Sequence, residues 1–427
     1  MQSYYNPFRI RVLLSVILLS LVWTVSCSRD DDDLARNAEN DQFYELMKEW
    51  YFWTDQMPTI NPSSYENIGQ VLEALRYRNL DRWSFIEDWD VLMAFFENTE
   101  FIGYGFGSRY DSQGQLRISF IYNTVPMFEL GVRRGWIIQA INDTPVNPGT
   151  NINSLLGANQ AGVKNTFRMT DPKGNLVEFE LAKEVLQVNT VLHHEVIDQN
   201  NLTIGYLVLQ TFTGSTADEL EEIFAQFKEA GIEELILDMR YNGGGLTSAA
   251  TLLSALIGGE NVAGQPFARY AFNRFKQDRN SVVNFGNEAN GLGLNRLVVI
   301  ATGSSASASE MVINGLRPYM DVTIVGNNTY GKPMGSNILR FKNWGVAPIT
   351  FNVTNANDEG DFFDGIPVDI PASDDLEYDF GDGREGSFQQ ALSFISFGVA
   401  KYQPVKKTLY EQPSESFRGL QRMTGSH

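Results

Sequence analysis

Residues 296–310 read RLVVIATGSSASASE, an apolar run followed by a cluster of small hydroxyl side chains. The apolar part, Arg296–Ala301, predicts a short buried strand. Apolar residues then recur at helical spacing from 309 to 317, and Pro318 ends that predicted helix. Small residues between the two elements allow a bound molecule to approach the backbone closely. Ser307 therefore lies near the start of a helix, where its hydroxyl is a candidate nucleophile.

Lys332 is the candidate base for this serine. About ten helical residues carry the chain some 15 Å away from Ser307. The next predicted strand, 322–326, and the residues around it bring the chain back by nearly 20 Å if about six of them are extended. Lys332 can therefore return to the start of the helix. To accept a proton the amine must be neutral at the working pH, so burial has to lower its pKa.

A Ser-His-Asp triad is the alternative, but few histidines are available for it. The chain has three histidines, and His427 is its last residue. His193 and His194 are adjacent, in an alternating stretch that predicts a strand. A triad would need one of these two. Adjacent histidines on a strand are more typical of half-exposed structural residues, so the serine-lysine pair is favoured and the triad stays open.

A second motif, Asp238–Gly245, reads DMRYNGGG and lies between a predicted strand at 235–239 and a predicted helix at 246–257. Its three glycines allow positive φ angles and a close backbone approach. Amide groups at the start of a helix suit an anion or the oxyanion of acyl transfer. Taken alone, the pattern favours an ordinary turn between a strand and a helix. The Lys-Ser/Thr of a phosphate loop is missing, which argues against nucleotide binding.

Together these motifs resemble those of the carboxyl-terminal processing peptidases, also called tail-specific proteases. That family has a strand, an Asn-Gly-Gly-Gly-like turn, a Ser-Ala-Ser-Ala-Ser-Glu motif and then a Gly-Lys. The resemblance extends over about residues 40–400 in the order of the motifs. It implies a serine endopeptidase with an α/β, ClpP/crotonase-like catalytic core. It also implies a Ser-Lys dyad of Ser307 and Lys332, with an oxyanion hole made by the amides of Ala308 and Gly244.

Two positions depart from the family pattern. Ser336 stands where many members have a glutamine that orients the lysine, and Pro318 stands where many bacterial members have an aspartate. A serine hydroxyl can still accept a hydrogen bond from an amine, so Ser336 remains the candidate orienting residue. The departures keep open an alternative from another class, a catalytically inactive lipoprotein of the same fold that binds peptides.

A peptide-binding domain is predicted upstream. The segment Gly103-Tyr104-Gly105-Phe106 resembles the carboxylate-binding loop of PDZ domains, and 131–142 (GVRRGWIIQAIN) resembles their later Gly-Leu-x-x-Gly-Asp segment. Each fragment alone is weak, because Gly-aromatic-Gly also marks a strand kink. Together they imply a PDZ-like, β-rich domain that binds polypeptides with free C-termini by strand addition.

These motifs divide the chain into regions. A small, aromatic-rich N-terminal helical region is predicted over 41–98. The PDZ-like domain follows over 99–187 and the catalytic α/β domain over 188–400. Residues 401–427 are then a C-terminal tail.

The N-terminal residues predict export. Arg9 and Arg11 precede an apolar stretch that is too short for a comfortable membrane span, and 1–26 therefore resembles a signal peptide. Thr24-Val25-Ser26-Cys27 resembles a bacterial lipobox, so Cys27 is expected to carry a lipid. An ordinary signal peptide with an incidental cysteine is the alternative.

Residues 27–40, which include four consecutive aspartates, are expected to be an acidic tether after the lipidated cysteine. The expected location is the bacterial cell envelope, with the lipid anchored in the outer membrane. The sequence does not decide between the periplasmic face and the cell surface. The cell surface is included because acidic residues after the cysteine resemble a surface-export signal of some Gram-negative bacteria.

Composition bounds the remaining choices. The formal charge of −19 argues against nucleic acid as a partner. The single cysteine excludes an intrachain disulfide, and histidines are too few and too dispersed for a structural zinc site. The acidic loops at 358–364 and 374–382 lack the ligand spacing of a calcium loop and are interpreted as solvated turns. No cofactor or metal is expected, and the sequence does not indicate an oligomeric state.

Overall fold

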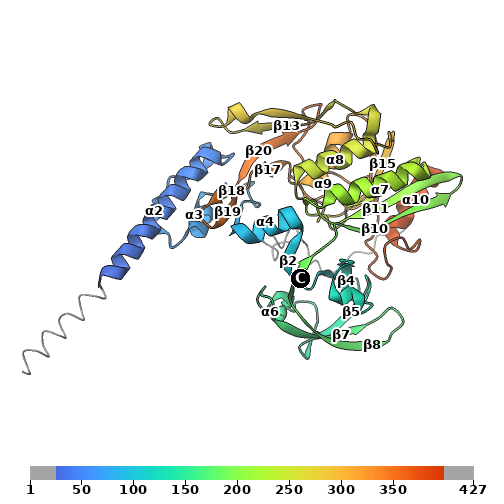
Figure 1. Ribbon diagram of the computed structural model, residues 1–427, viewed down its shortest axis with the longest axis horizontal. Helices are drawn as coiled ribbons and strands as arrows, with labels where there is room; N and C mark the ends of the chain where they lie inside the picture. Colours follow the sequence, from blue (N-terminus) through green and yellow to red (C-terminus); the bar gives the residue numbers. More distant parts are fainter. Residues whose placement is uncertain (1–25, 399–427) are drawn as a thin grey trace, which may run out of the picture.

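The computed structural model describes residues 26–398, with side chains described from Asp33 onward. Its centre is a six-stranded sheet in the order β10-β11-β12-β15-β16-β21 (Figure 1). β10 is antiparallel to β11, and every other neighbouring pair is parallel. The strands are β10 (Val191–Gln199), β11 (Leu202–Leu209), β12 (Glu234–Asp238), β15 (Arg296–Ala301), β16 (Asp321–Gly326) and β21 (Ile370–Pro371). The predicted α/β architecture is confirmed.

Both faces of this sheet are buried, which is why its strands read as continuous apolar runs. Side chains alternate between the two faces along each strand. In β15, Leu297 and Val299 belong to one hydrophobic core, whereas Val298 and Ile300 belong to the other. The first core is covered by α7 (Thr216–Ala230), α8 (Thr247–Gly258) and α9 (Ala308–Leu316), and the second by α10 (Gly386–Phe397) together with the β-rich region before β10.

The strand-turn-helix units follow the sequence closely. β15 has the predicted bounds, α9 begins one residue before the predicted helix at 309–317, and α8 is shifted by one residue from 246–257. Because the parallel strands β12 and β15 are neighbours, the loops that follow their carboxyl ends lie together. The glycine turn after β12 and the serine cluster after β15 are these two loops.

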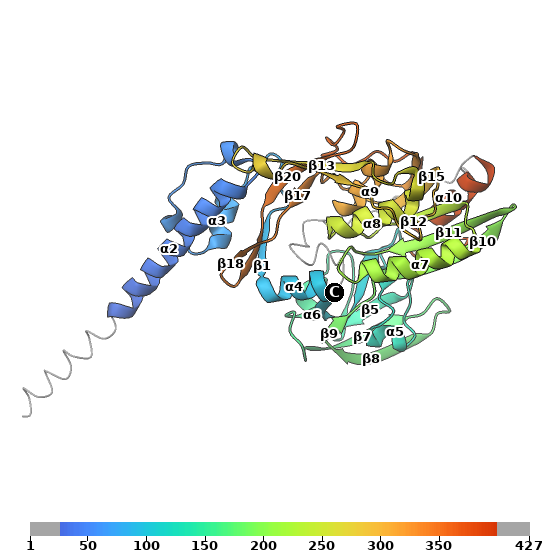
Figure 2. The ribbon, with the colours of Figure 1, turned by 45° about the horizontal axis from the view of Figure 1, so that its top comes forward.

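The region predicted to be PDZ-like is a separate β-rich unit beside the central sheet (Figures 1 and 2). Its main sheet has the order β3-β4-β5-β7-β8, and a separate pair, β2 with β9, precedes and follows it in the chain. Its elements are β2 (Glu100–Gly103), β3 (Phe106–Tyr110), β4 (Leu116–Ile121), α5 (Pro126–Glu129), β5 (Ile137–Ile141), β6 (Thr144–Pro145), α6 (Ile152–Leu156), β7 (Lys164–Thr170), β8 (Leu176–Ala182) and β9 (Glu184–Gln187).

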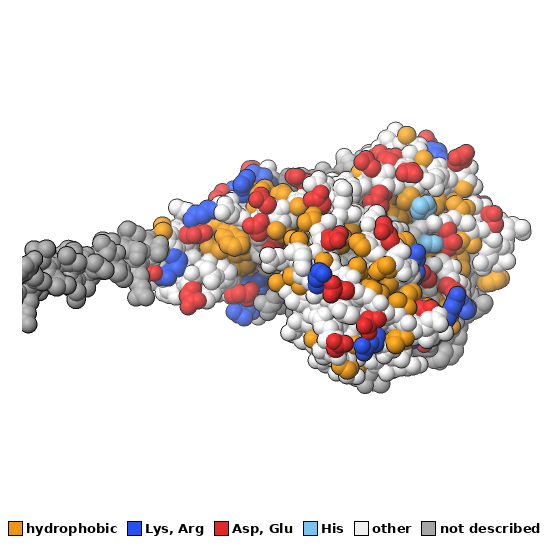
Figure 3. Space-filling view, turned by 60° about the horizontal axis from the view of Figure 1, so that its bottom comes forward, with side chains coloured by type: hydrophobic (Ala, Val, Ile, Leu, Met, Phe, Trp, Pro, Cys, Tyr) orange, Lys and Arg blue, Asp and Glu red, His pale blue; other side chains and the backbone are white. Residues whose placement is uncertain are grey.

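On the face of the molecule seen in Figure 3, acidic and basic side chains are interspersed.

The N-terminal region is helical but contains one strand. Its elements are α2 (Ser26–Trp50), η1 (Thr54–Gln56), η2 (Pro62–Ser64), α3 (Ile68–Leu75), β1 (Phe85–Asp88) and α4 (Trp89–Asn98). β1 pairs antiparallel with β19 (Trp344–Ala347), which also pairs with β18 (Leu339–Phe341). No local pattern within 41–98 reveals this strand, because its partner lies far away in the sequence.

A four-stranded sheet lies between this region and the central sheet with its helices. Its order is β14-β13-β20-β17. The strands are β13 (Pro266–Phe272), β14 (Ser281–Asn284), β17 (Met334–Ser336) and β20 (Ile349–Thr354), and two short helical turns, η3 (Gly259–Asn261) and η4 (Gln277–Arg279), accompany them.

The predicted signal peptide and the tail at 401–427 fall outside the described residues, except for Ser26. The side chain of Cys27 falls outside them as well. The backbone of the predicted acidic tether, 27–40, is helical and forms the first part of α2. Within the described part of the chain, no helix has the length and apolar character needed to cross a membrane.

A buried cluster of charges joins the glycine turn after β12 to its surroundings. The guanidinium of Arg240, with 1% of its side chain exposed, donates to Asp238, Asp374 and Glu385 at 2.7–2.9 Å. Arg134, from the β-rich unit, donates to the same carboxylate of Asp374 at 2.8 Å. Burial alone would raise the pKa of Asp374, but the two arginines outweigh it and hold that pKa well below its ordinary range.

Arg240→Ala should lower the free energy of unfolding by roughly 3–5 kcal/mol, because it leaves buried carboxylates without their partner. Chemical denaturation of the full chain measures the change. Arg384→Ala is the matched control, since Arg384 forms an exposed pair with Asp382; its midpoint should stay at the wild-type value. Equal midpoints for both variants would contradict a structural role for the cluster.

Candidate active site

Ser307 occupies an unusual backbone position. It directly precedes α9 and has φ 56° and ψ −112°, in the region that disfavours side chains other than glycine. Such a conformation costs about 1–3 kcal/mol, persists only when the surroundings enforce it, and is found often at active sites. The residue is half-buried, so its side chain is reachable from solvent.

The neighbouring serines of the motif are committed to structural bonds. The hydroxyl of Ser305 donates to the carbonyl of Met239 at 2.7 Å, and that of Ser309 donates to the carbonyl of Asn242 at 2.9 Å. Both serines are completely buried. These bonds fasten the serine loop to the turn after β12. They leave Ser307 as the serine of this motif that can act as a nucleophile.

Glu310 connects the serine to the lysine. Its carboxylate is completely buried and accepts hydrogen bonds from the amide of Ser307 at 2.9 Å and the amide of Lys332 at 2.8 Å. The amide of Gly331 and the hydroxyl of Thr329 also donate to it, each at 2.6 Å. Burial raises the pKa of Glu310, and these four donors oppose that effect. One side chain thus sets the distance between the two loops.

Lys332 has the electrostatic properties that a general base requires. Burial lowers the pKa of its amine from about 10.5 to about 8, although Asp81 and Glu310 act in the opposite direction. Lysines tuned in this way are neutral often enough to accept a proton near neutral pH. No hydrogen bond joins the Lys332 amine to the Ser307 hydroxyl in this structure. Catalytic contacts are often long without substrate and tighten when it binds.

The residues of the predicted oxyanion hole, Gly244 and Ala308, lie beside Ser307. A Cβ atom at Gly244 would lie 2.9 Å from Ser307 Cβ and 3.2 Å from the amide nitrogen of Ala308, so the glycine turn touches the nucleophile. Ala308 is the first residue of α9, where helix amides lack an internal partner. The amide of Gly244, however, donates to the side chain of Asn242 at 2.9 Å. Participation of the Gly244 amide in an oxyanion hole stays a prediction, because Asn242 would have to release this amide or share it with the oxyanion.

Three other residues were predicted as candidates: Ser336 to orient the lysine, and His193 or His194 as the base of a triad. Ser336 ends β17, and no hydrogen bond joins it to Lys332, so its orienting role stays a prediction. His193 and His194 lie on β10, with rings packed against Tyr206 and Phe227, respectively. Neither histidine contacts Ser307, and the structure therefore gives the Ser-His alternative no support.

The predicted carboxylate-binding loop is present as a turn between β2 and β3. Gly105 has φ 76°, which only glycine adopts readily, and all four residues Gly103–Phe106 are buried. The ring of Tyr104 is anchored by hydrogen bonds of its hydroxyl with Asn165 and the carbonyl of Val163. In this conformation the loop is covered, so binding of a peptide carboxylate there stays a prediction.

Sequence reasoning missed the residues that hold the dyad in place. Glu310 follows Ser307 at the Ser-x-x-Glu spacing of a helix capping box, a signal that was available. The segment with Asp81 and Arg82 did have a signal, since Arg82-Trp83-Ser84 resembles an Asp-Arg-aromatic-Ser pattern of the family, but the sequence indicated no role for it beyond packing, because only the tertiary fold brings it to the lysine loop. No group of three or more potential metal ligands is found among the described residues.

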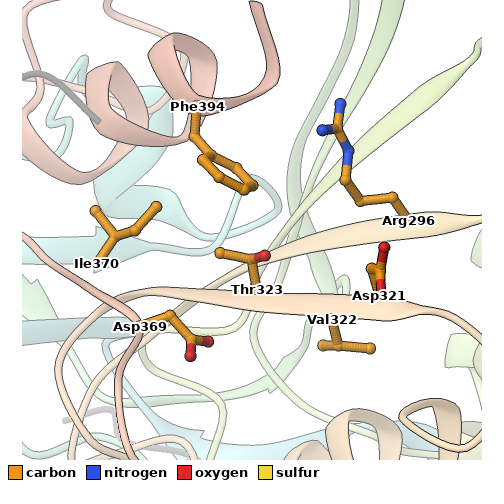
Figure 4. Close-up of a pocket in the computed structure, with 7 residues that line it drawn as sticks. All are labelled: Arg296, Asp321, Val322, Thr323, Asp369, Ile370 and Phe394. Carbon is orange, nitrogen blue, oxygen red and sulfur yellow. The ribbon is translucent and has the colours of Figure 1, made fainter. Parts of the chain in front are cut away.

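One open pocket lies on the opposite edge of the central sheet. It is lined by Arg296, Asp321, Val322, Thr323, Asp369, Ile370 and Phe394 (Figure 4). Arg296 and Asp321 begin β15 and β16, whereas Ser307 follows the end of β15. The pocket is therefore separate from the serine and lysine.

Comparisons with known proteins agree with this site. The model of peptidase family S41 matches residues 203–372, and that of the peptidase S41 N-terminal domain matches 38–85. The chain belongs to peptidase family S41. It is 23% identical over 294 residues to the carboxy-terminal processing protease CtpA of Bacillus subtilis (strain 168), covering 68% of this chain and 58% of that protein.

A second relative is the carboxyl-terminal-processing protease of Synechocystis sp. (strain ATCC 27184 / PCC 6803 / Kazusa). It is 28% identical over 155 residues, which cover 36% of this chain and 34% of that protein. The chain thus spans about a third to somewhat over half of the length of these two relatives.

Solved structures show the same fold. A candidate S41 protease from Bacteroides fragilis NCTC 9343 superposes with a TM-score of 0.71 and 24% identity, over 84% of this chain and 97% of that one. The photosystem II D1 C-terminal processing protease gives a TM-score of 0.51 and 18% identity, over 79% and 92%, respectively.

Replacing Lys332 by methionine should stabilise the protein in a pH-dependent way. Below pH 8 the folded chain bears the cost of a buried lysine, because the unfolded lysine keeps its proton up to about pH 10.5. Wild-type stability should therefore rise between pH 8 and 10.5. Lys332→Met should be more stable than wild type by roughly 2–3 kcal/mol at pH 7, and this difference should shrink toward pH 10.5.

Denaturant midpoints at several pH values measure this difference. Lys173→Met, at an exposed position, is the control and should show no such trend. A constant difference between Lys332→Met and wild type from pH 7 to 10.5 would show that the lysine has an ordinary pKa.

Proposed function

We propose that the protein is a serine endopeptidase that cleaves polypeptides through a Ser-Lys dyad and an acyl-enzyme. The observation that carries the proposal is the shared attachment of Ser307 and Lys332 to Glu310, together with a lysine pKa lowered to about 8. The committed hydroxyls of Ser305 and Ser309 support the assignment of Ser307 as the nucleophile.

The proposed reaction uses these groups in two steps. Lys332 Nζ takes the proton of Ser307 Oγ as that oxygen attacks the scissile carbonyl carbon, and the resulting oxyanion lies against the amides of Ala308 and Gly244. The C–N bond then breaks, the lysine returns the proton to the leaving amine, and an ester to Ser307 remains. In the second step Lys332 takes a proton from water and the hydroxide oxygen attacks the ester carbonyl. The bond from that carbon to Ser307 Oγ then breaks, the new carboxylic acid leaves, and Lys332 returns the proton to Ser307 Oγ.

We infer that cleavage takes place near free C-termini that the β-rich unit of 99–187 recognises. Contacts between this unit and the catalytic loops support such a coupling. The guanidinium of Arg109 donates to the hydroxyl of Ser304, and that of Arg134 donates to Tyr241 in the glycine turn. Peptide occupancy of the unit can therefore act on the residues next to Ser307.

The proposed location is the bacterial cell envelope. The N-terminal pattern supports removal of a signal peptide and lipidation of Cys27, which would anchor the chain in the outer membrane. Attachment through the lipid also suits a chain with a formal charge of −19, because an anionic lipid surface would repel it.

Ser307→Ala should abolish both the cleavage of an unfolded protein substrate and the labelling by a serine-directed fluorophosphonate. Losing the nucleophile of a catalytic unit typically costs about 10⁴-fold or more in rate. Ser304→Ala, just before the Ser-Ala-Ser-Ala-Ser-Glu motif of 305–310, is the control and should keep labelling. A wild-type chain that is never labelled but binds peptides would instead support the inactive peptide-binding lipoprotein.

Peptides with a free C-terminus should bind the intact Ser307→Ala chain about tenfold more tightly than their amidated forms, since charge-assisted hydrogen bonds are roughly twice as strong as neutral ones. Titration calorimetry measures both affinities. Equal affinities would remove C-terminal recognition by Gly103–Phe106 and leave the dyad unaffected.

A further inference from the structure

The segment Asp81-Arg82-Trp83-Ser84 of the N-terminal region lies against the loop that carries Lys332. It directly precedes β1, which pairs with β19 in the three-stranded sheet β1-β19-β18 (Figure 2 labels β1 and β18). The guanidinium of Arg82 donates through one nitrogen to the carbonyls of Tyr330 at 3.3 Å and Gly331 at 3.2 Å. These are the two residues immediately before the lysine. A third carbonyl, that of Phe363, is 3.1 Å from the same nitrogen.

Aromatic rings hold the Arg82 side chain in this place. Its guanidinium lies 4.9 Å from the ring centre of Tyr330 and 5.0 Å from that of Trp83. Trp83 is in turn stacked on Phe363. Although Arg82 is exposed, it is therefore confined between the N-terminal region and the lysine loop.

Asp81 is the buried neighbour of Arg82. None of its side chain is exposed, and its carboxylate accepts hydrogen bonds from the Tyr51 and Ser84 hydroxyls at 2.7 Å and from the Trp83 and Ser84 amides at 3.0 Å. The hydroxyl of Ser84 also accepts a bond from the amide of Ile349. The carboxylate is thereby fixed between α2 and β20, where it cannot turn away.

The charges that act on the Lys332 amine come from two elements. Asp81 from the N-terminal region and Glu310 from α9 both favour its protonated form, in opposition to burial. Arg76, whose Nε lies 3.9 Å from Asp81, partly offsets the first of these carboxylates. Each of the two carboxylates accepts four hydrogen bonds, but Glu310 belongs to α9 and Asp81 to the N-terminal region.

We propose that Asp81 and Arg82 are positioning residues of the active site: Arg82 fixes the backbone of the lysine loop, and the buried carboxylate of Asp81, the residue before Arg82, supplies a fixed negative charge next to that contact. The N-terminal region then completes the site instead of only packing against it. This inference rests on the proposed function of Lys332 as the base.

The two residues should influence Lys332 in opposite directions. Without the Asp81 charge, the buried ammonium loses an attractive partner, and the lysine pKa should fall. Without Arg82, the loop is released from one of its anchors and a nearby positive charge is removed. Water can then reach the amine, and the lysine pKa should rise toward that of a free lysine. Simple damage to packing would expose the amine in both variants and shift both in the same direction.

Competitive acetylation of Lys332 in the full chain, followed by mass spectrometry across a pH series, measures its pKa without requiring activity. Asp81→Asn should lower that pKa by about one unit, the usual size for the loss of one neighbouring charge. Arg82→Ala should raise it, and Arg82→Lys should raise it as well, because an ammonium does not reproduce the planar guanidinium. Arg78→Ala is the matched control, since Arg78 is an exposed arginine bonded to the carbonyl of Glu73.

Fluorophosphonate labelling of Ser307 over the same pH range provides the second readout. The rising limb of the rate should move to lower pH in Asp81→Asn and to higher pH in Arg82→Ala, with about a tenfold lower rate at pH 7 for a shift of one unit in the latter. If Asp81→Asn does not fold, an unchanged Lys332 pKa in Arg82→Ala and Arg82→Lys would still overturn the positioning role of Arg82.

The two hypotheses fail in distinguishable ways. An unchanged Lys332 pKa in folded Asp81→Asn and Arg82→Ala, or an upward shift in both, would overturn the positioning role even if wild type is active. A second outcome is possible: the Lys332 pKa shifts in opposite directions in Asp81→Asn and Arg82→Ala, but the wild-type chain is never labelled by the probe. This outcome would support the placement of Asp81 and Arg82 and reject the peptidase activity.

Discussion

The carboxylate of Glu310 is the constraint on which the candidate site depends. It lies in the first turn of α9, where the helix dipole favours a negative charge, and four donors surround it. Two of these donors are the backbone amides of Ser307 and Lys332. A buried acceptor tolerates little displacement of its donors, because each unpaired group would cost about 1–3 kcal/mol. The spacing between the backbones of Ser307 and Lys332 is therefore set by these hydrogen bonds and not by the flexible lysine side chain.

The central sheet creates the setting in which this carboxylate can act. The parallel strands β12 and β15 end side by side, so the glycine turn and the serine loop meet at one edge. Ser305 and Ser309 fasten the serine loop to the turn, and Gly244 leaves no room for a side chain beside Ser307. The positive φ of Ser307 is maintained by these contacts on both sides. Local strain is thus supported by a rigid layer of buried strands.

Other parts of the chain reach this edge from opposite sides. The β-rich unit contributes Arg109 and Arg134, which contact Ser304 and the buried charge cluster. The N-terminal region contributes Arg82, which holds the carbonyls that precede Lys332. Each contact is made by an arginine, whose several donors can bind more than one acceptor. The catalytic loops therefore lie between two flanking regions, each able to alter a different member of the site.

The strand-turn-helix units and the candidates Ser307 and Lys332 could be predicted from the sequence alone. These follow from local signals: apolar periodicity, glycine and proline positions, and the crowding of small residues into two loops. Only the tertiary structure decided the pairing of β1 with β19, the covered state of Gly103–Phe106 and the contacts of Glu310 and Arg82 with the lysine loop. The physical reason is distance along the chain. Hydrogen bonds and charges act between groups that the fold brings together, and local periodicity contains no information about such partners.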